Sequence, residues 1–361
     1  MITPHWVVGQ ERISSQFNAW KTAANLNTVP HFYFYEQEYD QLDWTREPSS
    51  TWDQLCYDRC MQLRLKYKKL SLFYSAGRDS HHILRCFNNF KIPLDEIVLI
   101  NHLTLPTRQY ELNNYIVPQV QKFISNNPGT QVKMIEVAPS DFERYFRDDW
   151  LEKTSTALTH GYFFPTNFAY YTAQIMKYND QTHGVIVGAD KPRIIRENDK
   201  FYSVVLDKTI EVFLTDRSNL EFFYYAPDLP ELYLKQVWMT LNHINSKYAP
   251  TQTITAEFLV EYCGNSHSDY YDDFCLSCGR GPAWDLSLGI QNGKSKNKAN
   301  GRSQAFLNNL KYGIENNWAS ARNFSYAMDY LKDNYARLFN KSDPYHGTIG
   351  VYGKRYYLKD A

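Results

Sequence analysis

The sequence lacks an excess of charge of either sign and a long apolar run. Lys and Arg together number 39, and Asp and Glu also number 39, so the formal net charge is zero at neutral pH. This balance argues against a polybasic surface for a nucleic-acid or membrane partner, although it leaves room for a local basic patch. No apolar stretch is long enough to span a bilayer, so we expect no transmembrane helix.

The sequence is also poor in cysteine and lacks a secretory signal. Only six of the 361 residues are cysteine, which is too few for a disulfide scaffold. Two of them form a close Cys-x-x-Cys pair, which suits a metal or redox site in a reducing compartment. The first residues, Met1 to Trp6, do not place basic residues before an apolar stretch. We therefore expect a soluble cytoplasmic protein.

Apolar runs alternate with helical patterns over residues 69–188. We expect strands at 69–74, 96–101, 131–137 and 183–188, and helices at 79–90, 108–126, 140–150 and 167–178. This alternation predicts an α/β fold with a parallel sheet of about five strands flanked by helices. Because the runs are apolar throughout, the strands should be covered on both faces. Such sheets bind ligands beyond the carboxyl ends of their strands.

The rest of the chain is less regular. We predict a helical or loop N-terminal extension over 1–68, an α/β domain over 69–220 and a mainly helical C-terminal region over 221–361. Further elements are expected as a hairpin at 193–206 turning at Glu197-Asn198-Asp199, helices at 229–248 and 303–339, and a terminal hairpin at 348–358 around Gly353-Lys354.

The strongest local signal is the segment Ser75-Ala76-Gly77-Arg78-Asp79-Ser80, which connects a strand to a helix. Such a turn presents backbone N–H groups to an anion, and the helix adds partial positive charge. Ser75 and Ser80 can donate hydroxyls to phosphate oxygens, and Gly77 permits close approach or a positive φ. Asp79 would need a cation such as Mg²⁺ beside the phosphates. The alternative is a tight turn with an Asp-Ser helix cap.

This segment lacks the Walker lysine and instead resembles the PP-loop of the ATP pyrophosphatase superfamily, with signature Ser-Gly-Gly-x-Asp-Ser/Thr. That group includes asparagine synthetase and 7-cyano-7-deazaguanine synthase, which cleave ATP to AMP and pyrophosphate and thereby activate a carbonyl or carboxylate. The resemblance covers roughly residues 69–230. It implies an adenine nucleotide alpha hydrolase-like fold, with ATP and Mg²⁺ bound at Ser75, Ala76, Gly77, Arg78, Asp79 and Ser80. Ala76 departs from the family, which has glycine there.

A second turn falls on the same predicted sheet edge. Gly188-Ala189-Asp190-Lys191 follows the strand at 183–188 and resembles the second motif of asparagine synthetase-like enzymes. The resemblance implies that Asp190 joins Asp79 in holding Mg²⁺. Lys191 would offset charge on the leaving pyrophosphate. Asn101 ends another strand, where family members place adenine. A β-turn ahead of the hairpin is the alternative for 188–191.

Cysteines and a histidine gather in the loop-rich region 263–302. Cys263, His267, Cys275 and Cys278 offer four N/S ligands, which suit tetrahedral Zn²⁺. The cluster faintly resembles the C-terminal zinc site of 7-cyano-7-deazaguanine synthase, although that family uses four cysteines. Unliganded thiols are the alternative. Cys56, Cys60 and Cys86 are expected to be buried small hydrophobes.

Two further features bear on the partners. Ile2 stands where glutamine-dependent asparagine synthetases carry a cysteine nucleophile, and about 68 residues before the loop are too few for a glutaminase domain. The nitrogen must then come from ammonia, a substrate amine or a partner. The segment 291–302 is either a mobile surface loop or a lid or nucleic-acid contact through Lys294, Lys296, Lys298 and Arg302.

Together these features predict an ATP-dependent adenylating enzyme that forms a C–N bond on a small-molecule or nucleobase acceptor. One alternative is sulfur transfer to a nucleotide through Cys275 or Cys278. Another is a protein that binds ATP without turnover, which Ala76 hints at. The oligomeric state stays open.

Overall fold

A computed structural model of the chain describes residues 4–13, 16–103, 112–137, 177–188, 192–207, 219–247 and 351–361, with scattered positions between 311 and 334. Several predicted features lie outside these residues. They are the helix at 140–150, most of the helix at 167–178, the start of the helix at 108–126 and the loop at 263–302.

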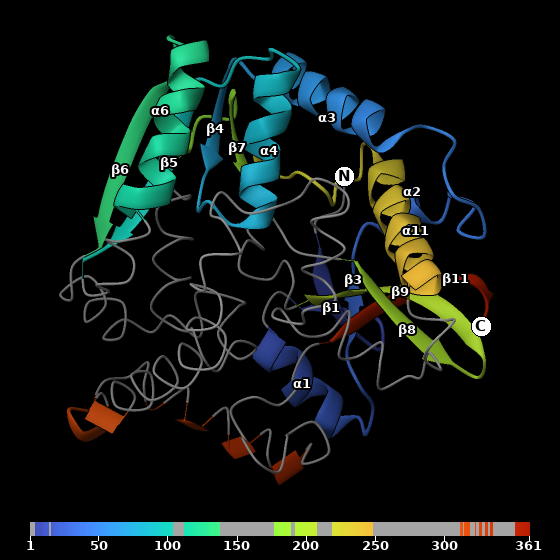
Figure 1. Cartoon of the computed structure of the whole chain (residues 1–361). Helices are drawn as coiled ribbons and strands as arrows, with labels where there is room; N and C mark the ends of the chain where they lie inside the picture. The colour runs from blue at the N-terminus through green and yellow to red at the C-terminus, as the bar shows by residue number, and fades with distance from the viewer. Residues whose placement is uncertain are drawn as a thin grey trace.

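A five-stranded parallel sheet forms the centre of the described structure (Figure 1). Its strands are β4 (Lys69–Phe73), β5 (Glu96–His102), β6 (Gln131–Val137), β7 (His183–Val187) and β10 (Leu220–Phe222). The spatial order is β10-β7-β4-β5-β6, and every pairing is parallel. The predicted α/β class and five-stranded parallel sheet are therefore confirmed.

The strand order reverses at the middle of this sheet. The chain runs outward through β4, β5 and β6, and it then returns to place β7 on the other side of β4. Connections that follow β4 and β7 therefore leave the same sheet edge in different directions. A crevice outside the carboxyl ends of the strands forms at such a reversal and is where open α/β sheets bind ligands.

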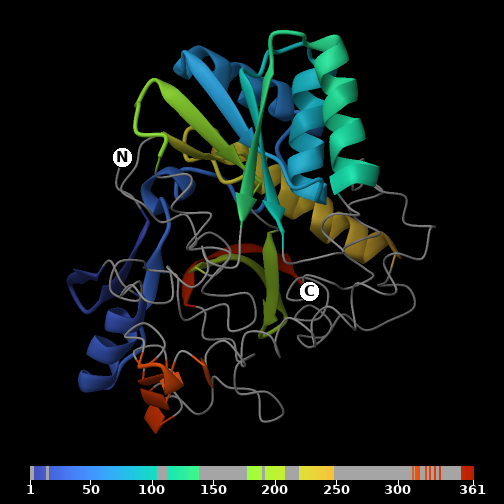
Figure 2. The same ribbon diagram turned by 90° about the vertical axis from the view of Figure 1, so that its left-hand side faces the viewer.

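Helices cover the sheet and join it to the rest of the chain. They are α3 (Trp52–Lys66), α4 (Arg78–Asn89), a π-helical turn (Leu112–Ile116), α6 (Val117–Asn126) and α11 (Pro230–Lys247). α4 and α6 lie together on one face of the sheet (Figures 1 and 2). α3 packs against β4, α4 and α11. The helix predicted at 108–126 changes from π to α just before Pro118, which has no N–H to donate.

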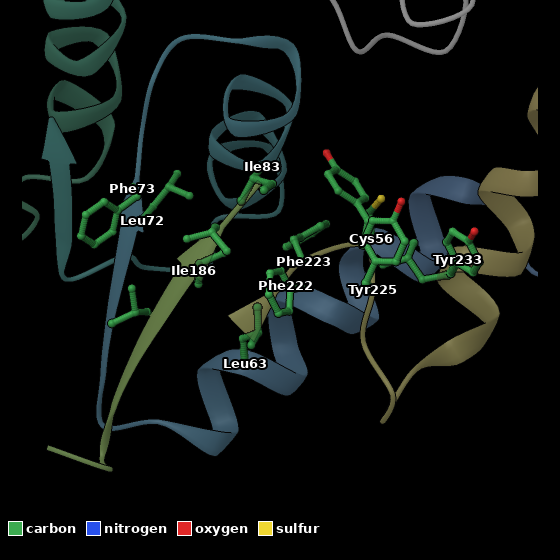
Figure 3. Packing of buried hydrophobic residues seen from close by; sticks show 14 of the residues in the cluster. Cys56, Leu63, Leu72, Phe73, Ile83, Ile186, Phe222, Phe223, Tyr225 and Tyr233 are labelled. Carbon is green, nitrogen blue, oxygen red and sulfur yellow. The ribbon is translucent and has the colours of Figure 1, made fainter. Parts of the chain in front are cut away.

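The core is continuous from the sheet to these helices. Figure 3 shows part of it, with Leu72 of β4, Ile186 of β7 and Ile83 of α4. All three side chains are fully buried, as expected for a sheet covered on both faces. Ser71 is the polar exception, and its hydroxyl lies 2.7 Å from both Glu96 Oε2 and His183 Nε2. This hydroxyl therefore links three neighbouring strands and is satisfied where it is buried.

Two small antiparallel sheets lie beside the parallel one. The first contains β1 (His5–Val8), β2 (Glu11–Ile13) and β3 (His31–Tyr33), and the second contains β8 (Arg193–Glu197), β9 (Lys200–Leu206) and β11 (Tyr352–Asp360). The short helices here are α1 (Gln16–Asn25) and α2 (Glu36–Tyr39). The predicted hairpin at 193–206 is confirmed. Asn198 and Asp199 have φ of 48° and 55°, the left-handed values that a tight two-residue hairpin turn requires.

The predicted terminal hairpin is wrong. β11 continues as one strand through Gly353 and Lys354 and pairs with β9, with a register shift between Tyr352 and Arg355. A Cβ on Gly353 would lie 2.7 Å from the carbonyl oxygen of Phe32. The glycine therefore marks the close passage of β11 over β3 and not a turn.

The predicted division of the chain also differs from the observed contacts. Residues 1–68 contain a three-stranded sheet, and α3 from this stretch packs on the central layer. The boundary between 220 and 221 falls inside β10, which belongs to the parallel sheet. The sheet thus extends just beyond the end of the predicted α/β domain, and a helix from before that domain packs on it.

Asp207, buried just after β9, ties distant segments together. Its carboxylate accepts hydrogen bonds from Trp6 Nε1 at 2.7 Å, Gln16 Nε2 at 2.8 Å and the Val351 backbone N–H at 2.9 Å. Bonds to an ionised acceptor are stronger than neutral ones. This carboxylate therefore joins β1, α1, β9 and the start of the last strand.

A second buried polar cluster fixes the edge strand β10 to α3. The Arg59 side chain is fully buried, and its Nη2 lies 2.7 Å from Glu221 Oε2. The guanidinium also donates to the carbonyl oxygens of Phe222 and Phe223 at 3.0 and 3.3 Å. Burial alone would raise the pKa of Glu221, but Arg59 and Lys66 outweigh it and hold that pKa below the ordinary value of 4.5.

Among the helices that the structure describes, none has both the length and the apolar character needed to cross a membrane.

Replacing Glu221 with Gln should destabilise the fold by about 2–3 kcal/mol, because the buried Arg59 then keeps only the half-buried Asp228 as a counter-charge. Urea unfolding at pH 7 measures this. Glu11→Gln, at an exposed position of β2, is the control and should change stability by less than about 0.5 kcal/mol. A loss below about 1 kcal/mol in Glu221→Gln would contradict a coupled buried pair.

Lowering the pH should reduce the difference in the free energy of unfolding between the wild-type chain and Glu221→Gln. Because the pKa of Glu221 is lowered in the fold, its contribution is fully present above the ordinary value of 4.5. That contribution is lost as pH falls through the folded pKa. Unfolding measured at decreasing pH should therefore show the wild-type chain approaching Glu221→Gln, and a constant difference would contradict this.

Candidate functional site

The loop that follows β4 leads directly into the start of α4. Gly77 is the N-cap residue, with extended φ and ψ of −67° and 166°, and it supplies no side-chain cap. The first intrahelical bond runs from the His81 N–H to the Gly77 carbonyl at 2.8 Å. Backbone N–H groups in the first turn of a helix have no carbonyl partner within it, and they favour an anion in front of them. This helix start therefore suits a phosphate group.

Two serine hydroxyls brace the loop. Ser80 Oγ accepts from the Ser75 N–H at 3.1 Å and donates to the Gly77 carbonyl at 3.3 Å. The two hydroxyl oxygens lie 3.1 Å apart, and Ser75 Oγ accepts from the Gly77 N–H at 3.3 Å. When Ser80 donates to Gly77, Ser75 is the donor in the contact between the two hydroxyls, so Ser75 can donate to a ligand only in place of Ser80.

The residue with positive φ in this loop is Ala76, not Gly77. Ala76 has φ of 58° and is fully buried, whereas Gly77 is extended. Of the two roles expected for Gly77, close approach or a positive φ, the positive φ is therefore not observed. An L-residue in this region costs about 1–2 kcal/mol, and glycine avoids that cost. The loop has a backbone that suits glycine at position 76 while carrying a methyl group there.

Gly188 brings the end of β7 against this helix start. A Cβ on Gly188 would lie 2.9 Å from the backbone nitrogen of Ser80 and 3.0 Å from the Cβ of Asp79. No side chain fits between these two segments. The structure thus places Gly188 and the loop together at the reversal of strand order. Asn101, buried at the carboxyl end of β5, lies on the same sheet edge one strand further along.

The remaining predicted site residues lie outside the described residues. They are Asp190 and Lys191, which follow Gly188 closely in sequence, and the zinc candidates Cys263, His267, Cys275 and Cys278.

The described residues fit a magnesium-bound nucleotide. Asp79 is half-buried in the first turn of α4, where a carboxylate is favoured by the helix dipole and can serve as an oxygen ligand for Mg²⁺. Arg78 precedes it and is also half-buried. The start of α4 would hold phosphate, and Gly188 adjoins it without a side chain.

The two histidines after the loop face inward. His81 Nδ1 lies 3.0 Å from the hydroxyl of Tyr74, and burial lowers the pKa of His81 to about 4. His82 Nδ1 lies 2.8 Å from the hydroxyl of Tyr224, and its ring stacks on Trp52. His81 is therefore neutral at pH 7, and both imidazoles belong to the packing beneath the loop.

Beneath the loop lies a cluster that the sequence did not reveal. Cys56, His82 and Cys86 are buried, and their ligand atoms all lie within 4.8 Å of one another. The prediction that Cys56, Cys60 and Cys86 are buried is confirmed. Hydrogen bonding to the Cys56 thiol is the main cause that lowers the pKa of Cys86, to about 5. The one-turn spacing of His82 and Cys86 on α4 was the available signal, but Cys56 comes from another helix.

No protein-family model matches this chain, and no curated protein matches its sequence. The functional assignment therefore depends on the loop motif and on the geometry around it.

Gly188→Ala should weaken nucleotide binding at least about tenfold, equivalent to about 1.4 kcal/mol. The added methyl would overlap the Ser80 backbone and push the helix start away from β7. Overpacking of this kind also costs about 1–3 kcal/mol of stability. Gly129→Ala is the matched control, since a Cβ there meets nothing within 4 Å. Titration calorimetry with ATP and Mg²⁺ measures both, and equal affinities would contradict the shared crevice.

Ala76→Gly should change stability by no more than about 1 kcal/mol, because relief of left-handed strain offsets the loss of a buried methyl. Nucleotide affinity should be kept or improved. Ala76→Val should lose more than about 2 kcal/mol, since a β-branched residue suits neither the positive φ nor the filled space. Thermal and urea unfolding compare the three chains. Equal stability of the Gly and Val variants would show that the loop backbone is not held at this φ.

Proposed function

We propose that this chain binds ATP with Mg²⁺ and uses it to adenylate a substrate. The observation that carries the proposal is the glycine-capped start of α4, placed at the reversal of strand order and pressed against Gly188. The loop sequence from Ser75 to Ser80 supports the same ligand because it is similar to a PP-loop. Taken together, they favour phosphate at this edge of the sheet.

The direction of the nucleotide follows from the placement of the residues. The phosphates lie against the backbone N–H groups at the start of α4, with Ser75 offering a hydroxyl. Asp79 holds Mg²⁺ from the first turn, and Asp190 joins it from beyond β7. The base lies toward the carboxyl end of β5, where Asn101 is buried beside the site.

In the proposed reaction a carboxylate or carbonyl oxygen of the substrate attacks the α-phosphorus, and pyrophosphate leaves. The loop holds the pyrophosphate, and Lys191 offsets the charge that develops on it. A nitrogen nucleophile, supplied as ammonia, as a substrate amine or by a partner, then displaces AMP. The acceptor is a small molecule or nucleobase, and a nucleic acid remains a candidate through the basic segment 291–302. We place the reaction in the cytoplasm.

The described cysteines bear on the sulfur-transfer alternative. Cys56, Cys60 and Cys86 are buried between α3 and α4. A sulfur-transferring thiol must reach the nucleotide, so these three favour adenylation over sulfur transfer from this part of the chain. Cys275 and Cys278 are the residues through which that alternative would operate.

Asp79→Asn should weaken the binding of ATP with Mg²⁺ at least about tenfold, because it removes a charged metal ligand. In EDTA the variant should bind ATP as well as the wild-type chain or better, since a negative charge next to the phosphates is gone. Titration calorimetry under both conditions separates the metal-dependent part. Asp58→Asn on α3 is the control and should behave as wild type. Equal affinities for Asp79→Asn and wild type with Mg²⁺ would remove Asp79 from the site.

Turnover is tested with α-labelled ATP incubated with pools of amino acids, nucleobases and RNA. The wild-type chain should form AMP and pyrophosphate with one pool, and Asp79→Asn should abolish it. Tight ATP binding with no AMP from any pool would favour the protein that binds without turnover. Product formation that thiol alkylation abolishes in a zinc-free chain would favour sulfur transfer.

A further inference from the structure

Three potential metal ligands converge between two helices of the core. Cys56 lies on α3, and His82 and Cys86 lie one turn apart on α4, so that the two α4 side chains share a face. All three side chains are buried, and their ligand atoms lie within 4.8 Å of one another. Residues four apart on a helix form a natural chelating pair, and Cys56 closes the group from the neighbouring helix. Figure 3 shows Cys56 within the packed core.

The separation of one ligand pair matches a tetrahedral zinc site. Cys86 Sγ lies 3.6 Å from His82 Nε2. Zinc bonds of about 2.3 Å to sulfur and 2.0–2.1 Å to nitrogen, at a tetrahedral angle, place those two ligands about 3.6 Å apart. The sulfur and nitrogen atoms thus already have the separation that one shared ion requires.

Hydrogen bonds prepare His82 for this role. The Tyr224 hydroxyl donates to the Asp79 carbonyl at 3.3 Å and lies 2.8 Å from His82 Nδ1. A hydroxyl has one proton, so when Tyr224 donates it to the Asp79 carbonyl, His82 Nδ1 carries the hydrogen in its bond with Tyr224. His82 Nε2 is then the unprotonated nitrogen, which is the form that binds a metal. Cys86 Sγ lies 3.6 Å from Nε2 and 3.8 Å from Nδ1, so the sulfur lies over the ring, and the imidazole must turn before its lone pair meets a shared ion. Metal-binding histidines are usually oriented by such a second hydrogen bond.

Charge also favours zinc at this position. Two thiolates and one neutral imidazole around Zn²⁺ give a group with no net charge, which is the form that a buried site tolerates best. The three protein ligands leave one tetrahedral position for a small ligand such as water.

We propose that Cys56, His82 and Cys86 bind one Zn²⁺ ion, which joins α3 to α4 beneath the loop at Ser75 to Ser80. Tyr224 connects this ion to the loop through the carbonyl of Asp79. The site is separate from the zinc candidates at 263–278, and it does not depend on the proposed reaction with ATP. Metal binding and nucleotide binding are therefore measured independently of each other.

The test uses the full chain with Cys263→Ser, Cys275→Ser and Cys278→Ser, which removes the other cysteine cluster. This background chain is stripped with a chelator under reducing conditions and titrated with Co²⁺. We expect one equivalent bound, with the thiolate charge-transfer and visible bands of tetrahedral cobalt, and Zn²⁺ should displace it and raise the Tm.

Variants in this background assign the ligands. Cys86→Ser, Cys56→Ser and His82→Gln should each lose the cobalt spectrum or shift it strongly. Cys60→Ser is the matched control, since Cys60 is a buried cysteine one turn further along α3 and should leave the spectrum unchanged. Tyr224→Phe should keep the sulfur bands but weaken the affinity, because outer hydrogen bonds to ligands are worth about 10–100-fold in metal binding.

X-ray absorption is measured on the zinc-loaded background chain, in which Cys56, His82 and Cys86 are unchanged. It therefore tests the proposal even if a ligand variant fails to fold. It should show two sulfur ligands at about 2.3 Å and light-atom ligands at about 2.0–2.1 Å. Failure of the background chain to bind Co²⁺ or Zn²⁺ would overturn the proposal. A disulfide between Cys56 and Cys86 that persists under the reducing conditions would also overturn it. So would a loss of metal in Cys60→Ser as large as the loss in the ligand variants.

Discussion

The contact between Gly188 and the first turn of α4 is the constraint on which the candidate site depends. Parallel pairing sets Leu72 beside Ile186, so the chain leaves β4 and β7 at nearly the same height on the sheet edge. The two exits are then so close that an added Cβ would meet a backbone nitrogen at 2.9 Å. β7 is in turn flanked by β10, which the buried Arg59–Glu221 pair fixes to α3. The position of the start of α4 therefore depends on the pairing of β4 with β7 and on the buried pair that fixes β10 to α3.

The parallel sheet could be predicted because its signal is local. Each strand is a short apolar run followed by a helical pattern, and burial on both faces removes the alternation that would suggest another sheet type. The hairpin turn at Asn198 and Asp199 was equally local, since these residues tolerate left-handed backbone. The loop at Ser75 to Ser80 was found as a motif between a strand and a helix, and the structure places it there.

What the sequence did not reveal depends on residues far apart in the chain. Gly353 with Lys354 suggests a turn from local sequence alone. The glycine is needed instead because the carbonyl of Phe32, about three hundred residues earlier, leaves no room for a side chain. The left-handed residue in the loop is Ala76 because of how the loop packs, although glycine at 77 has the stronger local preference. Cys56 becomes a partner of His82 and Cys86 only when α3 lies beside α4. In each case tertiary packing decides a question that local composition leaves open.

Asp207 has a consequence for how the chain is made. Its carboxylate binds Trp6 and Gln16 near the beginning of the chain and Val351 near its end, and Lys354 reaches back to Asp40. Contacts between residues so distant in sequence slow folding, because a long loop must close before they form. All strands of the parallel sheet lie before residue 250, so the sheet can assemble early in synthesis. β3 contacts β11, which becomes available only after residue 351 has been synthesised. The strands β1 to β3 therefore complete their contacts only after residues 351–360 have been synthesised.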